Sequence, residues 1–175
     1  MRTKGMIQIL RPAYAYIGAL QLKRTAIAFD PRYMYYECGV YCDYEISIEK
    51  SSWNTIQLVS IDDNNNLIGY FSASINRQTY NISALGAINF CPKPNLIFCK
   101  DMKQFFTDLF IKFNFNKISW RVVVGNPAEE IYDRLIQAYG GRIVGTFKNE
   151  IKLWDGNLYD EKHYEILKDE FRIHN

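Results

Sequence analysis

The fold is decided by the stretch NPAEEIYDRL at residues 126–135, together with the pair Gly140-Gly141 that follows it. Asparagine often caps helices and proline is tolerated in a first helical turn, so Asn126 and Pro127 predict the start of a helix. Apolar residues then recur at helical spacing as far as Tyr139. The glycine pair ends this pattern, because glycine readily adopts the conformation found just past a helix end. The stretch therefore predicts one amphipathic helix.

Strands are expected on both sides of this helix. Residues 118–124 are a nearly continuous apolar run, typical of a buried strand, and residues 143–153 predict a longer strand after the glycines. Asp155-Gly156 is a turn pair, and residues 164–171 form a last element whose type the pattern leaves open, a final strand being one option. This half of the chain is predicted to run strand, helix, strand.

Upstream, the pattern predicts three more strands and a second helix. Residues 55–61 alternate with period two, residues 62–66 form a polar turn cluster, and residues 67–75 resume as a strand, which gives a hairpin. Residues 82–91 predict the third strand. The period then changes to that of an amphipathic helix over residues 98–113, whose apolar stripe consists of Met102, Phe105, Phe106, Leu109, Phe110 and Phe113.

The first fifty residues are harder to interpret. Residues 14–27 are compatible with a helix, and the aromatic run 33–36 with the start of another short helix. No repeat or linker divides the sequence, so residues 1–175 are expected to form a single domain. The order of elements implies an α/β (α+β) fold with a mixed, mostly antiparallel central sheet flanked by helices.

The composition is that of a soluble globular protein, with 48% hydrophobic and 23% charged residues. No apolar run is long enough to span a membrane, and the N-terminus lacks the apolar segment of a signal peptide. We therefore expect a cytoplasmic protein. Its four cysteines have neither paired spacing nor nearby histidines, which predicts reduced thiols and no metal site: Cys38, Cys42, Cys91 and Cys99.

The net charge is only +2, which argues against a nucleic-acid partner, but positive charge gathers in the middle of the chain. Residues 91–125 carry only two acidic residues, Asp101 and Asp108. They carry six basic residues, namely Lys93, Lys100, Lys103, Lys112, Lys117 and Arg121. This distribution favours a small anionic ligand there over a polyanion.

One candidate for chemistry is the start of the second helix. Lys100 and Lys103 lie near its N-terminus, where cations oppose the helix dipole. A phosphate held by the free N–H groups would account for them. The alternative is that both lysines lie on a solvated face with Asp101 offsetting them, and the residues by themselves favour that alternative.

The other candidate is the helix start at Asn126, with Tyr132 six residues later. A phenol keeps its proton at neutral pH and can deliver it to a departing thiolate. The alternative is that Tyr132 packs in the core and Asn126 only caps the helix, and again the residues by themselves favour it.

The pattern at residues 126–135, followed by GGRIVG at 140–145, resembles the second half of GNAT-superfamily acetyltransferases. NNNLIGY at 64–70 looks like the hairpin of that family, and residues 153–164 resemble the tail of its branch that modifies protein N-termini and related amines. The resemblance covers roughly residues 53 to 171. It implies the GNAT fold, with a central sheet that splays between the fourth and fifth strands.

The resemblance also implies an activity, the transfer of an acetyl group from acetyl-coenzyme A (acetyl-CoA) to a primary amine by direct attack, with no metal. Tyr132 would be the catalytic acid and Asn126 would hydrogen-bond the pantetheine arm. Further residues implied to contact the arm, along the third predicted strand, are Asn89, Phe90 and Cys91. Those implied to contact the pyrophosphate, at the start of the second helix, are Phe98, Cys99, Lys100, Asp101 and Met102.

Residues 93–100 depart from the family, whose phosphate loop is rich in glycine, because they contain none. This leaves open a second hypothesis, a GNAT-fold protein without catalysis that serves as a binding or structural module. A third hypothesis, acetylation of an aminoacyl-tRNA, needs a broad basic surface that this sequence supplies only modestly. The amine acceptor would be a protein N-terminus or a small amine, and a homodimer is one possible assembly.

Overall fold

The computed structural model describes residues 10–28, 30–36, 46–50 and 52–173. A seven-stranded sheet carries the fold, in the order β1-β2-β3-β4-β5-β7-β6. Its strands are β1 (Arg11–Pro12), β2 (Thr55–Ile61), β3 (Leu67–Asn76), β4 (Asn81–Asn89), β5 (Lys117–Val123), β6 (Arg142–Lys152) and β7 (Leu158–Leu167). Neighbouring strands are antiparallel except β4 and β5, which are parallel. The mixed, mostly antiparallel sheet expected from the sequence is confirmed.

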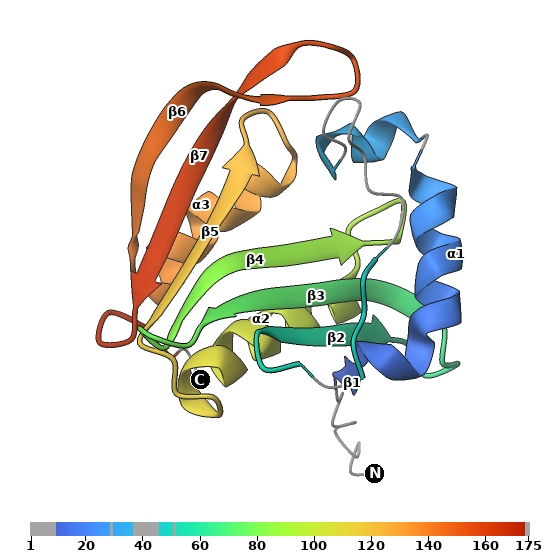
Figure 1. Ribbon diagram of the computed structural model, residues 1–175, viewed down its shortest axis with the longest axis horizontal. Coiled ribbons are helices and arrows are strands. Elements are labelled where there is room, and N and C mark those ends of the chain that lie inside the picture. Colours follow the sequence, from blue (N-terminus) through green and yellow to red (C-terminus); the bar gives the residue numbers. More distant parts are fainter. Residues whose placement is uncertain (1–9, 29, 37–45, 51, 174–175) are drawn as a thin grey trace, which may run out of the picture.

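The sheet parts between β4 and β5. These strands pair only where they begin, at Asn81–Lys117 and Ile82–Ile118. Beyond that point they diverge, as Figure 1 shows, and leave the far half of β4 without a strand beside it on that edge. The splay predicted between the fourth and fifth strands of the family is present in this chain.

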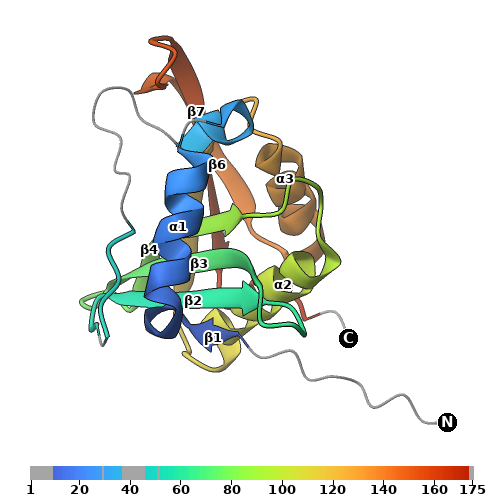
Figure 2. The ribbon, with the colours of Figure 1, turned by 90° about the vertical axis from the view of Figure 1, so that its right-hand side faces the viewer.

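Helices cover both faces of the sheet. They are α1 (Ile17–Ile27), α2 (Leu96–Ile111) and α3 (Ala128–Tyr139), with two short 3-10 helices, η1 (Ala13–Tyr16) and η2 (Pro31–Tyr36). Figure 2 shows α1 on one side of the sheet and α2 and α3 on the other. Adjacent side chains of β3 point to opposite faces of the sheet. Tyr70 therefore belongs to the cluster beside α1, and Phe71 to the cluster beside α2.

The larger core lies between the sheet and helices α2 and α3 and is rich in aromatic residues. Phe71 of β3 stacks on Phe98 at 4.9 Å between ring centroids, and Trp120 of β5 meets Phe106 edge-on at 5.3 Å. The apolar stripe predicted for the second helix supplies much of this core, with Phe105 and Leu109 fully buried. Burial of this stripe is what holds α2 against the sheet.

Each boundary of α2 and α3 has a local cause. Helix α2 begins two residues before the predicted start, because the Asn95 side chain caps it by accepting bonds from Ile97 N and Phe98 N. Helix α3 ends at the predicted glycine pair. Gly140 and Gly141 both have φ of 91°, and a side chain on Gly141 would lie 2.4 Å from the Glu165 carbonyl oxygen. Only glycine fits there.

The last element, which the pattern left open at residues 164–171, is a strand over Leu158–Leu167. The helical start is confirmed as η1 and α1, and the aromatic run 33–36 lies within η2. Strand β4 ends at Asn89, so Phe90 and Cys91, expected to be part of it, lie just after it.

Candidate active site

A cavity of about 470 Å³ lies where the sheet parts. Its walls come from the end of β4, the β4–α2 loop, the first turns of α2 and α3, and η2. Most lining residues are apolar or aromatic, and the charged ones among those described are Arg32 and Lys93, both cationic. The lining consists of Pro31, Arg32, Tyr33, Tyr35, Tyr36, Ala87, Asn89, Cys91, Pro92, Lys93, Pro94, Asn95, Phe98, Cys99, Met102, Asn126, Pro127, Ala128, Ile131 and Tyr132.

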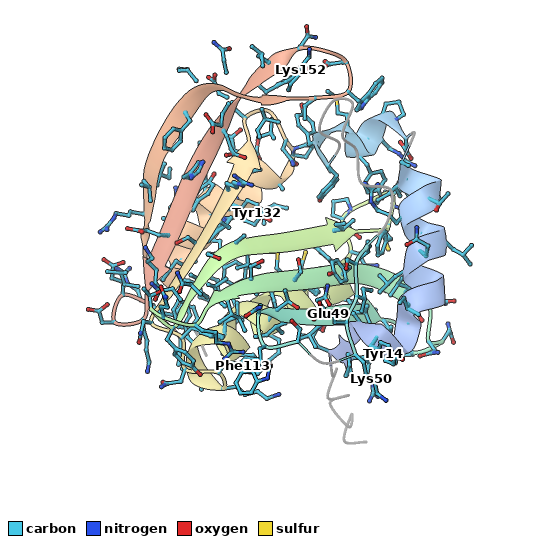
Figure 3. All side chains as sticks on the ribbon, in the orientation of Figure 1. Tyr14, Glu49, Lys50, Phe113, Tyr132 and Lys152 are labelled. Atoms are coloured by element: carbon cyan, nitrogen blue, oxygen red, sulfur yellow. The ribbon has the colours of Figure 1, made fainter. Side chains whose placement is uncertain are left out.

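Tyr132 reaches this cavity from α3, and Figure 3 shows it in the gap between β4 and β5. Its ring packs against Trp120 of β5 at 5.8 Å and Tyr164 of β7 at 5.9 Å. Burial raises the pKa of the Tyr132 phenol to about 12, since a phenolate would lose its hydration there. The hydroxyl therefore keeps its proton at neutral pH and can act as a hydrogen-bond donor.

Charged contacts with β7 fix the position of Tyr132. The next residue, Asp133, accepts hydrogen bonds from Tyr164 Oη at 2.8 Å and from Lys162 Nζ at 3.2 Å. Lys162 also forms an ion pair with Glu129, which accepts a hydrogen bond from Gly125 N at 2.9 Å. These bonds hold the first two turns of α3 against β7, so the Tyr132 ring has little freedom to move.

Although Pro127 stands at the N-cap position of α3, Asn126 bonds the first turn of the helix in the manner of a cap. Its Oδ1 accepts a hydrogen bond from Ala128 N at 2.9 Å, and its carbonyl oxygen accepts one from Glu129 N at 2.8 Å. Asn126 also lines the cavity, beside Tyr132.

Two asparagines organise the β4–α2 loop in place of glycines. Asn89 Oδ1 accepts a hydrogen bond from Cys91 N at 3.0 Å, and Asn89 Nδ2 donates to the Lys93 carbonyl at 3.3 Å. Asn95 Oδ1 accepts from Ile97 N at 2.8 Å and from Phe98 N at 3.2 Å. In this conformation, two of the amides that a phosphate would use at the start of α2 are bonded to Asn95.

The cavity brings together seven of the ten residues singled out from the sequence: Asn89, Cys91, Phe98, Cys99, Met102, Asn126 and Tyr132. The other three, Phe90, Lys100 and Asp101, are not part of its lining. Phe90 is buried in the cluster beside α1, and Lys100 is exposed. Asp101 turns to β2, where it accepts a hydrogen bond from Ser60 Oγ at 2.5 Å, and burial raises the pKa of its carboxyl group.

Helix η2 is the part of the cavity that sequence reasoning missed. Tyr33 Oη donates to the Asn89 carbonyl and Tyr36 Oη to the Ala87 carbonyl, both at 2.9 Å. Tyr35 packs edge-on against Tyr159 of β7 at 6.4 Å. The available signal was the aromatic run at residues 33–36, although nothing in it indicates which strand the tyrosines contact.

The structure gives no sign of a metal centre or a membrane helix within the part of the chain that it describes. No group of three or more His, Cys, Asp or Glu residues in that part could hold a metal ion. None of the described helices has the length and apolar character needed to cross a membrane.

Comparison with solved structures gives close matches in shape. Spermidine N-acetyltransferase from Vibrio cholerae, in complex with CoA and spermine, matches with a TM-score of 0.72 and 18% identity over 93% of this chain and 96% of that one. The chain has the GNAT fold. The GNAT fold predicted from residues 126–145 is thereby confirmed.

Two further structures match the GNAT core of the chain. The dodecameric structure of the same Vibrio cholerae enzyme in an intermediate state matches with a TM-score of 0.59 and 23% identity over 67% of each chain. A probable acetyltransferase matches with a TM-score of 0.56 and 18% identity over 67% of this chain and 64% of that one. No protein-family model and no curated protein sequence matches the chain. The likeness is therefore visible in the fold and hardly at all in the sequence.

Proposed function

We propose that this GNAT-fold protein is an acetyl-CoA-dependent N-acetyltransferase that acts on a primary amine. The observation that carries the proposal is the place of Tyr132, a proton-bearing phenol in a cavity between the diverging strands β4 and β5. GNAT-fold neighbours include an N-acetyltransferase bound to CoA and spermine. The acceptor here would be a protein N-terminus or a small amine.

The lining of the cavity suits an extended ligand with an anionic end. Apolar walls from Phe98, Met102 and Ile131 would contact the carbon chain, and Lys93 contributes positive charge. Asn126 would bond the pantetheine arm, and residues at the start of α2 would lie beside the pyrophosphate. Coenzyme A would supply the acetyl group as a thioester, and the amine would attack it directly.

Tyr132 would act on the leaving group. The raised pKa keeps the proton on Oη at neutral pH, so the hydroxyl would be ready to donate to the sulfur as the thiolate departs. Trp120 and Tyr164 hold the ring, so the hydroxyl points from a fixed place. The amine gives up its own proton to water.

A specific observation favours the second hypothesis, a GNAT-fold binding module without catalysis. The Asn95 side chain occupies the amides of Ile97 and Phe98, in a loop without glycine. A phosphate would have to displace Asn95 or bind beside it.

Calorimetric titration with CoA, acetyl-CoA and, as a control, free pantetheine tests the proposal. We expect acetyl-CoA to bind with micromolar affinity and to raise the melting temperature. An absence of binding at millimolar acetyl-CoA would exclude the enzyme and leave the binding module. Tighter binding of CoA than of pantetheine would show that the phosphates contribute, despite the glycine-free loop.

A further inference from the structure

The inner edge of β4 offers backbone carbonyls toward the gap. Phe90 N donates to Ile68 O of β3 at 2.9 Å, so backbone groups of the even-numbered residues at this end of β4 face β3. Those of Ala87 and Asn89 face the opposite side, where β5 has moved away. In a GNAT fold with a parted sheet, this edge is where an extended ligand can pair with the protein backbone.

The hydroxyls of Tyr33 and Tyr36, called here the η2 tyrosine pair, occupy these two carbonyls. The match is geometric. A 3-10 helix has three residues per turn and rises about 2.0 Å per residue, so side chains three apart share one face about 6 Å apart. Alternate carbonyls of a strand face the same way and are about 6.6 Å apart. Helix η2 thus presents two donors at the spacing of two strand acceptors.

Both tyrosines belong to the cavity wall as well. Tyr33 is buried with 8% of its surface exposed, and burial raises the pKa of its phenol and that of Tyr36. Each hydroxyl therefore stays protonated and acts as the donor to its carbonyl. Tyr132 lines the same cavity as the two tyrosines.

We propose that the η2 tyrosine pair competes with the pantetheine arm for the Ala87 and Asn89 carbonyls and closes the β4 edge in the ligand-free protein. The inference rests on the proposed function, because the competing ligand is the coenzyme. The pantetheine arm carries two amide N–H donors, and an arm that lies along β4 would need the acceptors that the tyrosines now hold. The two carbonyls become available to the arm when the two hydroxyls leave them.

The test is the double variant Tyr33→Phe/Tyr36→Phe, which keeps both rings and removes only the two hydroxyls. Since apparent affinity is proportional to the fraction of protein in the open, binding-competent state, CoA should bind the double variant about tenfold more tightly. Tyr80→Phe is the matched control, because its hydroxyl also donates to a backbone carbonyl, that of Phe113 at 3.0 Å, but does not line the cavity. Its affinity should stay within about twofold of wild type. Unchanged or weaker binding by the double variant, with wild type binding CoA, overturns the inference and leaves the proposed function intact.

A readout without coenzyme separates the two proposals. Cys91 lines the cavity and is partly buried. In a background with the other three cysteines replaced by serine, the rate of Cys91 labelling by a maleimide reports how open this edge is. We expect the double variant to label severalfold faster and Tyr80→Phe to label at the parent rate. Faster labelling without CoA binding would refute the proposed function but support the closed edge, whereas equal labelling rates would overturn the closed edge.

Discussion

Helices α2 and α3 both begin at an asparagine beside the same cavity, but the two sides use their polar groups differently. On the α2 side, the Asn95 side chain bonds two amides of its own helix, and Asn89 bonds its own loop. On the α3 side, Asp133 and Glu129 bond Lys162 of β7, and Tyr132 remains directed into the cavity. The α2 side closes on itself, whereas the α3 side is braced from behind and directs the Tyr132 phenol into the cavity.

The strongest way to break this comparison is Tyr132→Phe. If Tyr132 protonates the leaving thiolate, kcat should fall by about 100-fold while the dissociation constant of acetyl-CoA changes little. Steady-state kinetics with calorimetry on the same preparation would measure both. An unchanged kcat in a variant that still binds would make Tyr132 a packing residue.

A second test addresses the ion pairs of Lys162 with Glu129 and Asp133, called here the brace behind α3. Lys162→Met leaves Glu129 and Asp133 without their cation and should lower the free energy of unfolding by about 1–2 kcal/mol. The value falls below that of a fully buried pair because the Asp133 side chain is 35% exposed. Lys148→Met is the matched control, since Lys148 pairs with Asp160 on the surface and should matter by less than about 0.5 kcal/mol. Equal effects of the two variants would show that the brace is no stronger than a surface pair.

The same brace makes stability depend on pH. Its bond to Lys162 holds the pKa of Glu129 below the usual range, so the folded state favours the carboxylate. This stabilisation is complete above the unfolded pKa of about 4.3 and is lost as pH falls through the lower, folded value. The difference in melting temperature between wild type and Lys162→Met should therefore be full at pH 7 and shrink as the pH falls below about 4.3. A difference that stays constant over that fall would contradict the ion pair.

The smallest expected effects come from the two helix caps. Asn95→Ala and Asn126→Ala should each lower stability by about 1 kcal/mol, because each removes a side-chain acceptor from helix amides. Their effects on CoA should differ in sign. Asn95→Ala frees two amides for the phosphates and should tighten binding a few-fold, whereas Asn126→Ala removes a proposed contact to the arm and should weaken it a few-fold. If both variants weakened CoA binding equally, the proposed difference between the α2 side and the α3 side would be wrong.

The sequence predicted the elements whose signal is local. The 3.6-residue period of α2 and α3 and the glycine stop arise within a few residues and are confirmed, whereas Asn126 lies one residue before the N-cap of α3 and bonds its first turn. The sequence pattern did not identify β7 as a strand, because its polar residues interrupt the alternation of apolar and polar residues. They are accommodated by partners on neighbouring strands, as when Glu165 pairs with Lys117 of β5 and with Arg142 of β6.

The site was predicted where the family pattern is strong and missed where contacts are distant. Tyr132 and Asn126 lie in the cavity as expected, although their roles stay predictions. The bond from Tyr33 to Asn89 joins residues 56 positions apart, and no local pattern could show it. Asn95 bonds the α2 amides only in one orientation of its side chain, and the sequence pattern does not specify that orientation.

The parting of β4 and β5 also bears on how the molecule opens. A sheet usually transmits cooperativity through its backbone ladder, but here the ladder between the two halves narrows to the pairs at residues 81–82 and 117–118. Elsewhere the halves are joined through side chains such as the Phe106–Trp120 contact. Cooperative opening follows contiguous contacts, so strands β1–β4 and strands β5–β7 should behave as two units in hydrogen exchange, divided along this seam. A ligand that bridges the seam would merge them into one.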